Sequence, residues 1–391
     1  MIPLMKSAFL DEYNTKNELA KFIQQTNKFS MGEQCALFET KFSKFQGSKE
    51  GILLNSGGSA CLVMLQVLKN LSKIKSGDKI GFSGLTWSTN VMPIIQLGFI
   101  PVPIDCDPTT LNVMSNNLSE RIQDTDIKVL FLTNVLGFSG DLVDIKKICD
   151  KNDIILIEDN CEALGTEING KKTGTFGLMA SHSFFIAHHM STIEGGMIIT
   201  DDEELAEMAR IVRANGWDRN LNAKQQLKWR KDFNVDSEFF AKYTFYDLAF
   251  NMRPTEITGF LGCQQMNYLK ENIAIREKYY LRLELEVKNN PDIVNMENSH
   301  ISLLSSFAFP VVCKNIDFRD KYLKQFSGAG IEVRPMIAGD MQDQPFYIKY
   351  VNETYDLPGV NFLHNNSFYC GNYPELNEAD LQIISSCLSK Y

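Results

Sequence analysis

The chain has 391 residues, is 44% hydrophobic and 22% charged, and carries a formal net charge of −9. These values are ordinary for a soluble globular enzyme of about two to three domains, and the negative charge argues against non-specific nucleic-acid binding. No stretch approaches the roughly 18 apolar residues that span a bilayer, and the N-terminus lacks the apolar core of a signal peptide. We therefore expect a cytoplasmic protein with nine reduced cysteines and, because no CxC or CxxC pair occurs, no metal site.

Short apolar runs alternate with amphipathic segments from about residue 50 to 215. The expected strands are GILLNSG, KIGFSG, VLFLTNV, IILIEDN and GMIIT, and the expected helices between them include SACLVMLQVLKNL, LVDIKKICDKN and EELAEMARIVRAN. This alternation predicts an α/β domain with a mostly parallel sheet. Ligands of such sheets bind at the carboxyl ends of the strands, where NSGGS (55–59) and EDN (158–160) stand.

The pattern changes after residue 215. Residues 216–250 are rich in aromatic and charged side chains and predict a long loop with short helical pieces, after which Pro254 is expected to open a helix through TEITGFLGCQQMNYL. From about residue 300, the segments SSFAFPVV, DFRDKYLKQFSGAG, IEVRPM and NEADLQIISSCLSKY predict a smaller α+β domain. We expect a large domain over 1–260, with an N-terminal arm, and a small C-terminal domain over 261–391.

Two motifs near the amino end of this pattern are candidates for ligand contact. Gly57 and Gly58 stand between a strand and a helix, so their N–H groups can bind a phosphate at the helix N-terminus, although such turns often only connect two elements. Trp87, in LTWSTN, offers a flat aromatic face to a ring-shaped ligand, and its alternative is a large core residue.

The segment IILIEDNCEALG carries two carboxylates at the end of an expected strand. Asp159 follows a hydrophobic run, where a carboxylate is costly unless it is paired, and Glu162 follows three residues later. The alternative is a helix N-cap at Asp159, with Glu162 completing a capping box.

Three of the five histidines fall within residues 182–189, before a Glu-Gly-Gly turn at 194–196. A lone histidine is most often structural, but this clustering favours a functional role for His188. His189 is its neighbour, and two adjacent residues do not face the same point.

Taken together, these motifs resemble the nucleotide-sugar aminotransferases and dehydratases that use pyridoxal phosphate (PLP), a fold type I family with an aspartate-aminotransferase-like architecture. The resemblance runs from MGEQCALFETKF to the C-terminal helix. It implies that Gly57, Gly58, Ser59 and Ser183 contact the cofactor phosphate. It further implies that Trp87 stacks on the pyridine ring, that Asp159 pairs with the ring nitrogen, and that Glu162 lies near the ring 3-oxygen. Asn251 matches an asparagine that reaches the phosphate of a partner subunit, and its alternative is a polar residue at a helix start.

His188 stands where most of the family has the lysine that binds the cofactor covalently. A histidine can act as a base but cannot form that bond, and this exchange marks the sugar 3-dehydratases of the family. Resemblance is greatest to the branch that acts on GDP-4-keto-6-deoxy-D-mannose, with segments HHxxTxEGG and GWDRN…KYTFYDLAFNMRPTEI. It implies that L-glutamate converts PLP to pyridoxamine phosphate (PMP). His188 then removes a proton while the sugar loses its C3 hydroxyl, and ammonia and a 4-keto-3,6-dideoxy sugar are released. Asn215 departs from the histidine that relatives commonly carry.

Two other functions stay open. One is an iron–sulfur-dependent CDP-4-keto-6-deoxyglucose 3-dehydrase, which the absence of cysteine between 161 and 263 disfavours. The other is a non-catalytic PLP-fold binding or regulatory protein, which the retained cofactor residues disfavour. The resemblance implies a homodimer with shared active sites, and the candidate substrate contacts, which surface salt bridges explain equally well, are Arg219, Arg253, Glu332 and Arg334.

Overall fold

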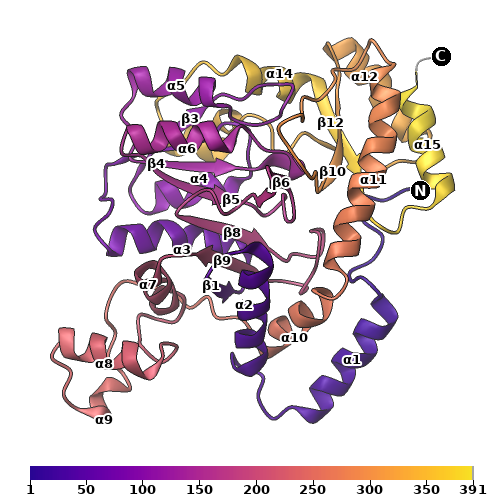
Figure 1. Ribbon diagram of the computed structural model, residues 1–391. Helices are drawn as coiled ribbons and strands as arrows, with labels where there is room; N and C mark the ends of the chain where they lie inside the picture. The colour runs from indigo at the N-terminus through magenta and orange to yellow at the C-terminus, as the bar shows by residue number, and fades with distance from the viewer. Residues whose placement is uncertain (390–391) are drawn as a thin grey trace.

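The computed structural model describes residues 1–389, with a seven-stranded sheet at its centre (Figure 1). The strands, in their order across the sheet, are β1 (Glu50–Leu54), β9 (Gly196–Thr200), β8 (Met179–Ser183), β5 (Ile155–Asp159), β4 (Val129–Thr133), β2 (Lys79–Ser83) and β3 (Ile100–Ile104). Only β9 runs antiparallel to its neighbours. The predicted α/β fold with a mostly parallel sheet is confirmed.

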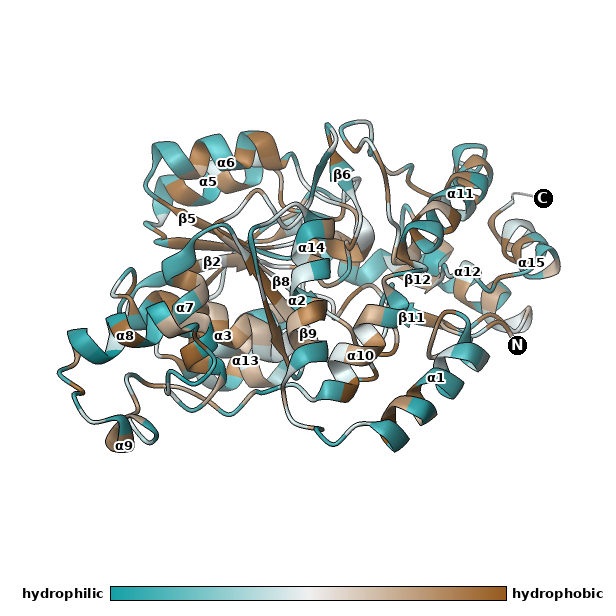
Figure 2. Cartoon of the chain, turned by 60° about the horizontal axis from the view of Figure 1, so that its bottom comes forward, coloured by the Kyte–Doolittle hydropathy of each residue, from teal (hydrophilic) through white to brown (hydrophobic). Residues whose placement is uncertain are grey.

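Alternating apolar side chains bury both faces of this sheet. In β4, Val129 and Phe131 join the core on one face, and Leu130 and Leu132 join the core on the other. Helices α3 (Gly57–Asn70), α4 (Ser88–Gln96) and α7 (Glu203–Arg213) cover the first face. The second face is covered by α5 (Ser115–Asp124), α6 (Leu142–Lys151) and α2 (Glu33–Gln46). Figure 2 shows the strands in brown between helices whose outer surfaces are teal.

At the two edges of the sheet, prolines or side-chain hydrogen bonds take up backbone positions that would otherwise be free to pair with another strand. At one edge, Ile100 N–H bonds to Asp78 O and Ile104 O accepts from Gly84 N, so Ile100, Val102 and Ile104 face β2, while Pro101 and Pro103 face outward. At the other edge, Leu53 N–H donates to Glu39 Oε1 at 2.8 Å and Leu53 O accepts from Arg213 Nη1 at 2.6 Å.

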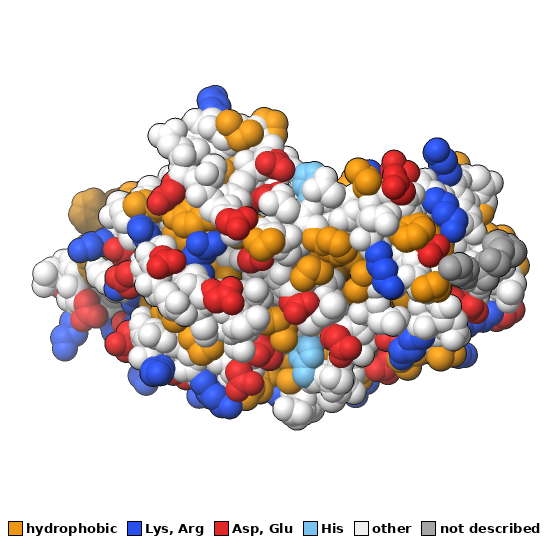
Figure 3. Space-filling view, turned by 90° about the horizontal axis from the view of Figure 1, so that it is seen from above, with side chains coloured by type: hydrophobic (Ala, Val, Ile, Leu, Met, Phe, Trp, Pro, Cys, Tyr) orange, Lys and Arg blue, Asp and Glu red, His pale blue; other side chains and the backbone are white. Residues whose placement is uncertain are grey.

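Two helical segments extend from the body of the molecule. Residues 216–250 form the predicted loop with short helical pieces, α8 (Ala223–Asp232) and α9 (Glu238–Ala241), which project at the lower left of Figure 1. Helix α1 (Glu12–Gln25) projects at the lower right and buries only Thr15. On the face seen in Figure 3, acidic and basic side chains are interspersed with apolar ones, so this face has no uniform basic surface for a polyanion.

The chain enters its C-terminal part through α10 and α11. Pro254 was expected to open a helix, but α10 (Glu256–Gln265) begins two residues later because Thr255 caps it by accepting a bond from Thr258 N. The long α11 (Leu269–Lys288) leads to a three-stranded sheet of β10 (Ala308–Val312), β12 (Ser367–Gly371) and β11 (Val333–Pro335). The remaining helices of this part are α12 (Ile316–Gly328), α13 (Pro345–Tyr350), α14 (Pro358–Asn366) and α15 (Glu378–Leu388).

Four short elements complete the structure: the hairpin β6 (Glu167–Ile168) and β7 (Lys171–Lys172), and the 3₁₀ turns η1 (Val135–Gly137) and η2 (Met341–Asp343). In residues 1–389, no helix has the length and apolar character needed to cross a membrane.

Candidate active site

A cavity of about 430 Å³ opens at the carboxyl ends of the central strands, where the sequence predicted ligand binding. The loops after β1, β2, β4, β5 and β8 supply most of its wall, and the C-terminal part supplies the rest. The sequence-predicted residues that line it are Gly57, Gly58, Trp87, Asp159, Glu162, Ser183 and His188. The other lining residues include Thr89, Thr133, Glu194, Phe307 and Tyr369.

The N-terminus of α3 forms one wall. Ser56 caps this helix by accepting a bond from Ser59 N at 3.1 Å, which leaves the N–H groups of Gly57 and Gly58 for a ligand. A Cβ on Gly57 would lie 2.6 Å from Ser183 Cβ, so the glycine lets α3 approach β8. The last glycine of the Glu-Gly-Gly turn likewise allows a close approach, to the N-cap of α3, since a Cβ on Gly196 would lie 2.1 Å from Ser56 O. Ser59 does not line the cavity, and its hydroxyl bonds to that of Ser56 at 3.0 Å.

Asp159 ends β5 and is only 4% exposed. Its carboxylate accepts bonds from Asn90 Nδ2 at 2.8 Å, Cys161 N at 2.9 Å and Ser181 Oγ at 3.2 Å. Within residues 1–389, no lysine, arginine or histidine forms an ion pair with it. The alternative of a helix N-cap is wrong, because a turn without a helix follows. A buried carboxylate that lacks a cation suits a ligand bearing a positively charged N–H group.

Glu162 lies on the same side of the cavity. Its Oε2 accepts a bond from Leu136 N at 2.8 Å, and Leu136 holds a left-handed backbone with φ of 53°. Burial raises the pKa of Glu162 to about 8, the Leu136 N–H opposes this shift, and the charge of Asp159 adds to it. Glu162 is therefore protonated at neutral pH and can donate a hydrogen bond.

Trp87 is 54% exposed, so the alternative of a core residue is wrong. It precedes the first residue of α4, with backbone angles of an extended strand, and its ring is free to stack on a planar ligand.

His188 lies in the turn after β8 and is half-buried. Its ring centroid is 5.3 Å from that of Phe307, and its Nδ1 has no hydrogen-bond partner in the described chain. Burial and then the charge of Arg276 lower the pKa of His188 to about 4, while the Cys161 backbone acts in the opposite direction. His188 is thus an unprotonated base at neutral pH. His189 lies outside this cavity, as expected for a neighbour, and its Nε2 is 3.0 Å from Ser305 O.

The other predicted residues lie away from the cavity. Arg253 Nε donates to Asn251 Oδ1 at 3.1 Å, and the guanidinium groups of Arg219 and Arg253 lie 4.0 and 5.7 Å from the ring centroid of Trp217. These three predicted residues form an exposed cluster. Asn251 is not at a helix start, because it forms an isolated β-bridge with Ala214 and α10 begins at Glu256.

Two further predicted contacts, Glu332 and Arg334, pair with each other at 2.6 Å. Glu332 also accepts a bond from Leu4 N at 3.0 Å, and Arg334 stands opposite Tyr369 in the sheet. Asn215, in the left-handed region at φ of 60°, donates its N–H to Phe250 O at 2.7 Å. None of these three residues lines the cavity.

Sequence reasoning missed the residues that the C-terminal part contributes. Phe307 and Tyr369 carry no local motif, because only the tertiary fold brings them to the ends of the central strands. Asn90 was detectable, since it lies one helical turn after Trp87 in LTWSTN and bonds to Asp159. No group of three or more His, Cys, Asp or Glu side chains in residues 1–389 is arranged to hold a metal ion.

Known proteins share this architecture. The sequence profile of the DegT/DnrJ/EryC1/StrS aminotransferase family matches residues 11–389. The chain is 34% identical to the GDP-4-keto-6-deoxy-D-mannose 3-dehydratase of Escherichia coli O55:H7 over 358 residues, 90% of each chain. Two solved structures of GDP-4-keto-6-deoxymannose-3-dehydratase are similar to this chain: a histidine-to-asparagine variant with bound GDP-perosamine, and the enzyme with a trapped PLP–glutamate geminal diamine. Each has a TM-score of 0.91 and 31% identity, with 100% of both chains covered.

Proposed function

Because the chain belongs to the DegT/DnrJ/EryC1/StrS aminotransferase family, we propose that it is a PLP/PMP-dependent 3-dehydratase of a nucleotide-linked 4-keto-6-deoxy sugar. The proposed substrate is GDP-4-keto-6-deoxy-D-mannose, on which the similar E. coli enzyme acts by its name. L-Glutamate is the proposed amino donor, and the products are ammonia and a 4-keto-3,6-dideoxy sugar. The observation that carries this proposal is that His188 lines the cavity and that no lysine is among the described residues that line it.

The lining residues fit a phosphorylated pyridine. The free N–H groups of Gly57 and Gly58 suit the phosphate, and Ser183, against which Gly57 is packed, adds a hydroxyl. Asp159, a buried carboxylate without a cationic partner, suits a protonated ring nitrogen. The exposed ring of Trp87 suits stacking, and protonated Glu162 suits donation to a ring oxygen. Such a cofactor, when bound, supplies an amine for the substrate ketone and a ring that accepts electrons.

The chain itself supplies a base and the means of orienting the ring. His188 is unprotonated at neutral pH, so an imidazole nitrogen can take a proton from carbon and return it. Asp159 keeps the ring nitrogen protonated, and Asn90, Ser181 and the Cys161 N–H hold that carboxylate in place. Because a histidine does not bind the cofactor covalently, the amine form remains free to react with the sugar.

The proposal includes a homodimer in which the cluster of Arg219, Asn251 and Arg253 faces the cavity of the partner. This cluster lies beside the projecting segment of α8 and α9, whose exposed side chains include Phe239, Phe240, Tyr243, Phe245 and Leu248. Large exposed apolar side chains gathered in one segment are typical of a protein interface. Two guanidinium groups near one another suit a nucleotide diphosphate.

The test is incubation with L-glutamate and PLP in the presence of GDP-, CDP- or dTDP-4-keto-6-deoxy sugars, with measurement of ammonia and 2-oxoglutarate. We expect ammonia release with the GDP sugar. His188→Asn should still bind PMP but lose dehydration, and His188→Lys should gain a protein–cofactor bond that borohydride reduces. His300→Asn is the matched histidine control, because His300 lies outside the cavity on Ser139 O.

The alternatives give different results. A borohydride-reducible bond in the wild type, or full dehydration by His188→Asn, would contradict the role of His188. Activity only with the CDP sugar and protein-bound iron would favour the iron–sulfur enzyme. No binding of PLP or PMP would favour a non-catalytic protein.

A further inference from the structure

Arg276 is a buried arginine, 4% exposed, in the middle of α11. Its Nη1 donates to Phe307 O at 2.9 Å, to Ser306 O at 3.4 Å and to Asn372 O. Its Nε donates to Asn272 Oδ1 at 2.7 Å. Within residues 1–389, no carboxylate forms an ion pair with it. A buried guanidinium bound only to neutral oxygens is costly to maintain, so a role beyond stability accounts for it better than packing alone.

The bonds of Arg276 lead directly to the turn that carries His188. Asn272, one helical turn earlier, donates from Nδ2 to His189 O. Phe307, whose carbonyl receives Arg276, packs its ring 5.3 Å from that of His188 and 6.1 Å from that of His189. The turn that contains His188 and His189, the histidine turn, is therefore held at two points. Asn272 bonds to its backbone, and Arg276 bonds to the carbonyl of Phe307, whose ring packs on His188.

The same chain of contacts continues to Glu162. Phe307 N donates to Leu136 O at 2.9 Å, and Leu136 N donates to Glu162 Oε2 at 2.8 Å. A displacement of Phe307 would thus move both His188 and Glu162, which line the cavity.

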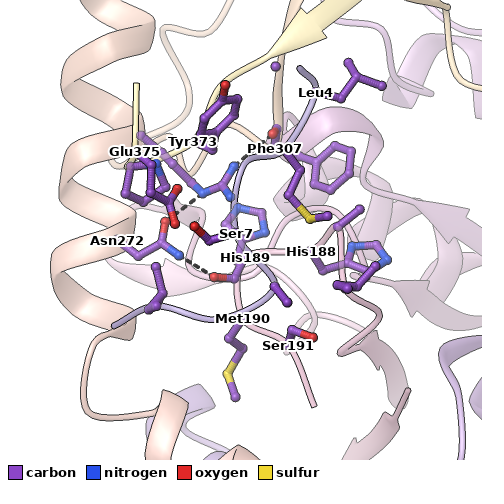
Figure 4. Close-up of a pocket in the computed structure, with 18 of the residues that line it drawn as sticks. Leu4, Ser7, His188, His189, Met190, Ser191, Asn272, Phe307, Tyr373 and Glu375 are labelled. Atoms are coloured by element: carbon purple, nitrogen blue, oxygen red, sulfur yellow. Dashed lines mark hydrogen bonds between the residues drawn. The ribbon is translucent and has the colours of Figure 1, made fainter. Parts of the chain in front are cut away.

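A second cavity of about 100 Å³ lies behind His188, on the side that faces α11 (Figure 4). Its labelled residues include His188, His189, Asn272, Phe307 and Glu375, and Arg276 also lines it. The titratable and charged groups that line either cavity around His188 are Asp159, Cys161, Glu162, His189, Glu194, Arg276, Tyr369, Tyr373 and Glu375. Arg276 is the cationic side chain among them, and it keeps its charge at neutral pH because burial lowers its pKa only to about 10.

We propose that Arg276 and Asn272 are a positioning pair for the dehydration reaction: they fix the His188–His189 turn at the cavity wall. The charge of Arg276 adds to burial, the larger cause, in disfavouring protonation of His188. Neither residue lines the cavity of the candidate active site. The effect on catalysis rests on the proposed function, whereas the effect on the protonation of His188 does not.

Two substitutions of Arg276 separate charge from geometry. Arg276→Met removes the charge and the donors, so kcat should fall about 100-fold, as for a misplaced catalytic group, and the acid limb of the pH–rate profile should move to higher pH. Arg276→Lys keeps the charge but loses the fork of donors, so kcat should fall while the acid limb stays in place. The matched control is Arg282→Met, on the same helix, because Arg282 pairs with Glu378 at the surface, away from both cavities.

Asn272→Asp is a second variant that tests the proposal if the arginine variants do not fold. The substitution keeps the shape and the acceptor for Arg276 but removes the donor to His189 O, and its carboxylate offsets the arginine charge. We expect a lower kcat and an acid limb at higher pH, and thermal unfolding measures how much stability each variant loses.

The second readout is NMR titration of ¹³C-labelled histidine in the cofactor-free protein, with His188→Asn used to assign the signal. The His188 signal of Arg276→Met should titrate at higher pH than that of the wild type, whereas the signal of Arg276→Lys should titrate as in the wild type. Unchanged titration and unchanged kcat in Arg276→Met and Asn272→Asp would overturn the proposal. If the wild type lacked dehydratase activity but the titrations behaved as expected, only the proposed function would fail.

Discussion

Replacing Gly57 by alanine tests the phosphate-binding wall of the cavity. The new Cβ would lie 2.6 Å from Ser183 Cβ, 3.0 Å from Ser183 Oγ and 3.2 Å from Cys161 Sγ. Carbon atoms in contact prefer about 3.5–4.0 Å, so α3 and the end of β8 must separate by about 1 Å. Such overpacking typically costs about 1–3 kcal/mol. If this cost falls on the bound state, the Kd for PMP rises about 5- to 150-fold.

The assay is isothermal titration of the cofactor-free protein with PMP, together with thermal unfolding with and without PMP. Gly58→Ala should have a smaller effect, since only one atom, Thr89 Cγ2 at 3.0 Å, would lie closer than ordinary contact distance to its Cβ. Gly328→Ala is the control, because no atom lies within 4 Å of the added Cβ. If Gly57→Ala bound PMP as tightly as Gly328→Ala, the assignment of this wall to the phosphate would be refuted.

Glu162→Gln should remove a pH dependence of stability. The folded pKa of Glu162, about 8, exceeds the ordinary glutamate pKa of 4.5, so the stabilising proton of the wild type is fully held below about pH 4.5 and is lost as the pH rises through 8. The melting temperature of the wild type minus that of the variant should therefore fall from pH 5 to 8, and a constant difference would argue against a protonated Glu162. Gly259→Ala should destabilise the fold by about 2–3 kcal/mol in urea unfolding relative to Gly328→Ala, because its Cβ would lie 2.4 Å from Cys35 N. A loss below about 1 kcal/mol would mean that α2 and α10 separate easily.

The sequence predicted those parts of the fold whose residues follow a local pattern. The apolar runs at β1, β2, β4, β5 and β9 were all recognised, as were α3, α6 and α7. Strand β8 was not, because its residues Ser181, His182 and Ser183 are polar although the strand is buried. Its polarity has a tertiary cause, since Ser181 bonds to Asp159 and His182 to Gln46. Strand β3 was also missed, because Pro101 and Pro103 are rare in strands away from an edge.

The candidate site was predictable to the extent that it consists of strand ends. Gly57 follows β1 and Asp159 ends β5, and parallel topology brings such positions together. Ser183 ends β8, which was not recognised, so the resemblance alone pointed to it. Phe307 and Arg276 were not predictable, since a bulky aromatic in SSFAFPVV reads as core and an arginine in a charged helix reads as surface. Only the packing of α11 against the histidine turn shows their relation to His188.

The two edges of the central sheet limit how this protein can assemble or aggregate. An exposed edge strand offers unpaired N–H and C=O groups on which another chain can add a strand. At β3 the outward positions are Pro101 and Pro103, which have no N–H to donate. At β1 the N–H and C=O of Leu53 are already bonded to Glu39 and Arg213, which pair with each other at 2.6 Å. Both edges therefore lack some of the free N–H groups that a strand from another molecule would need, which disfavours continuous sheets between molecules and favours self-association through side-chain surfaces.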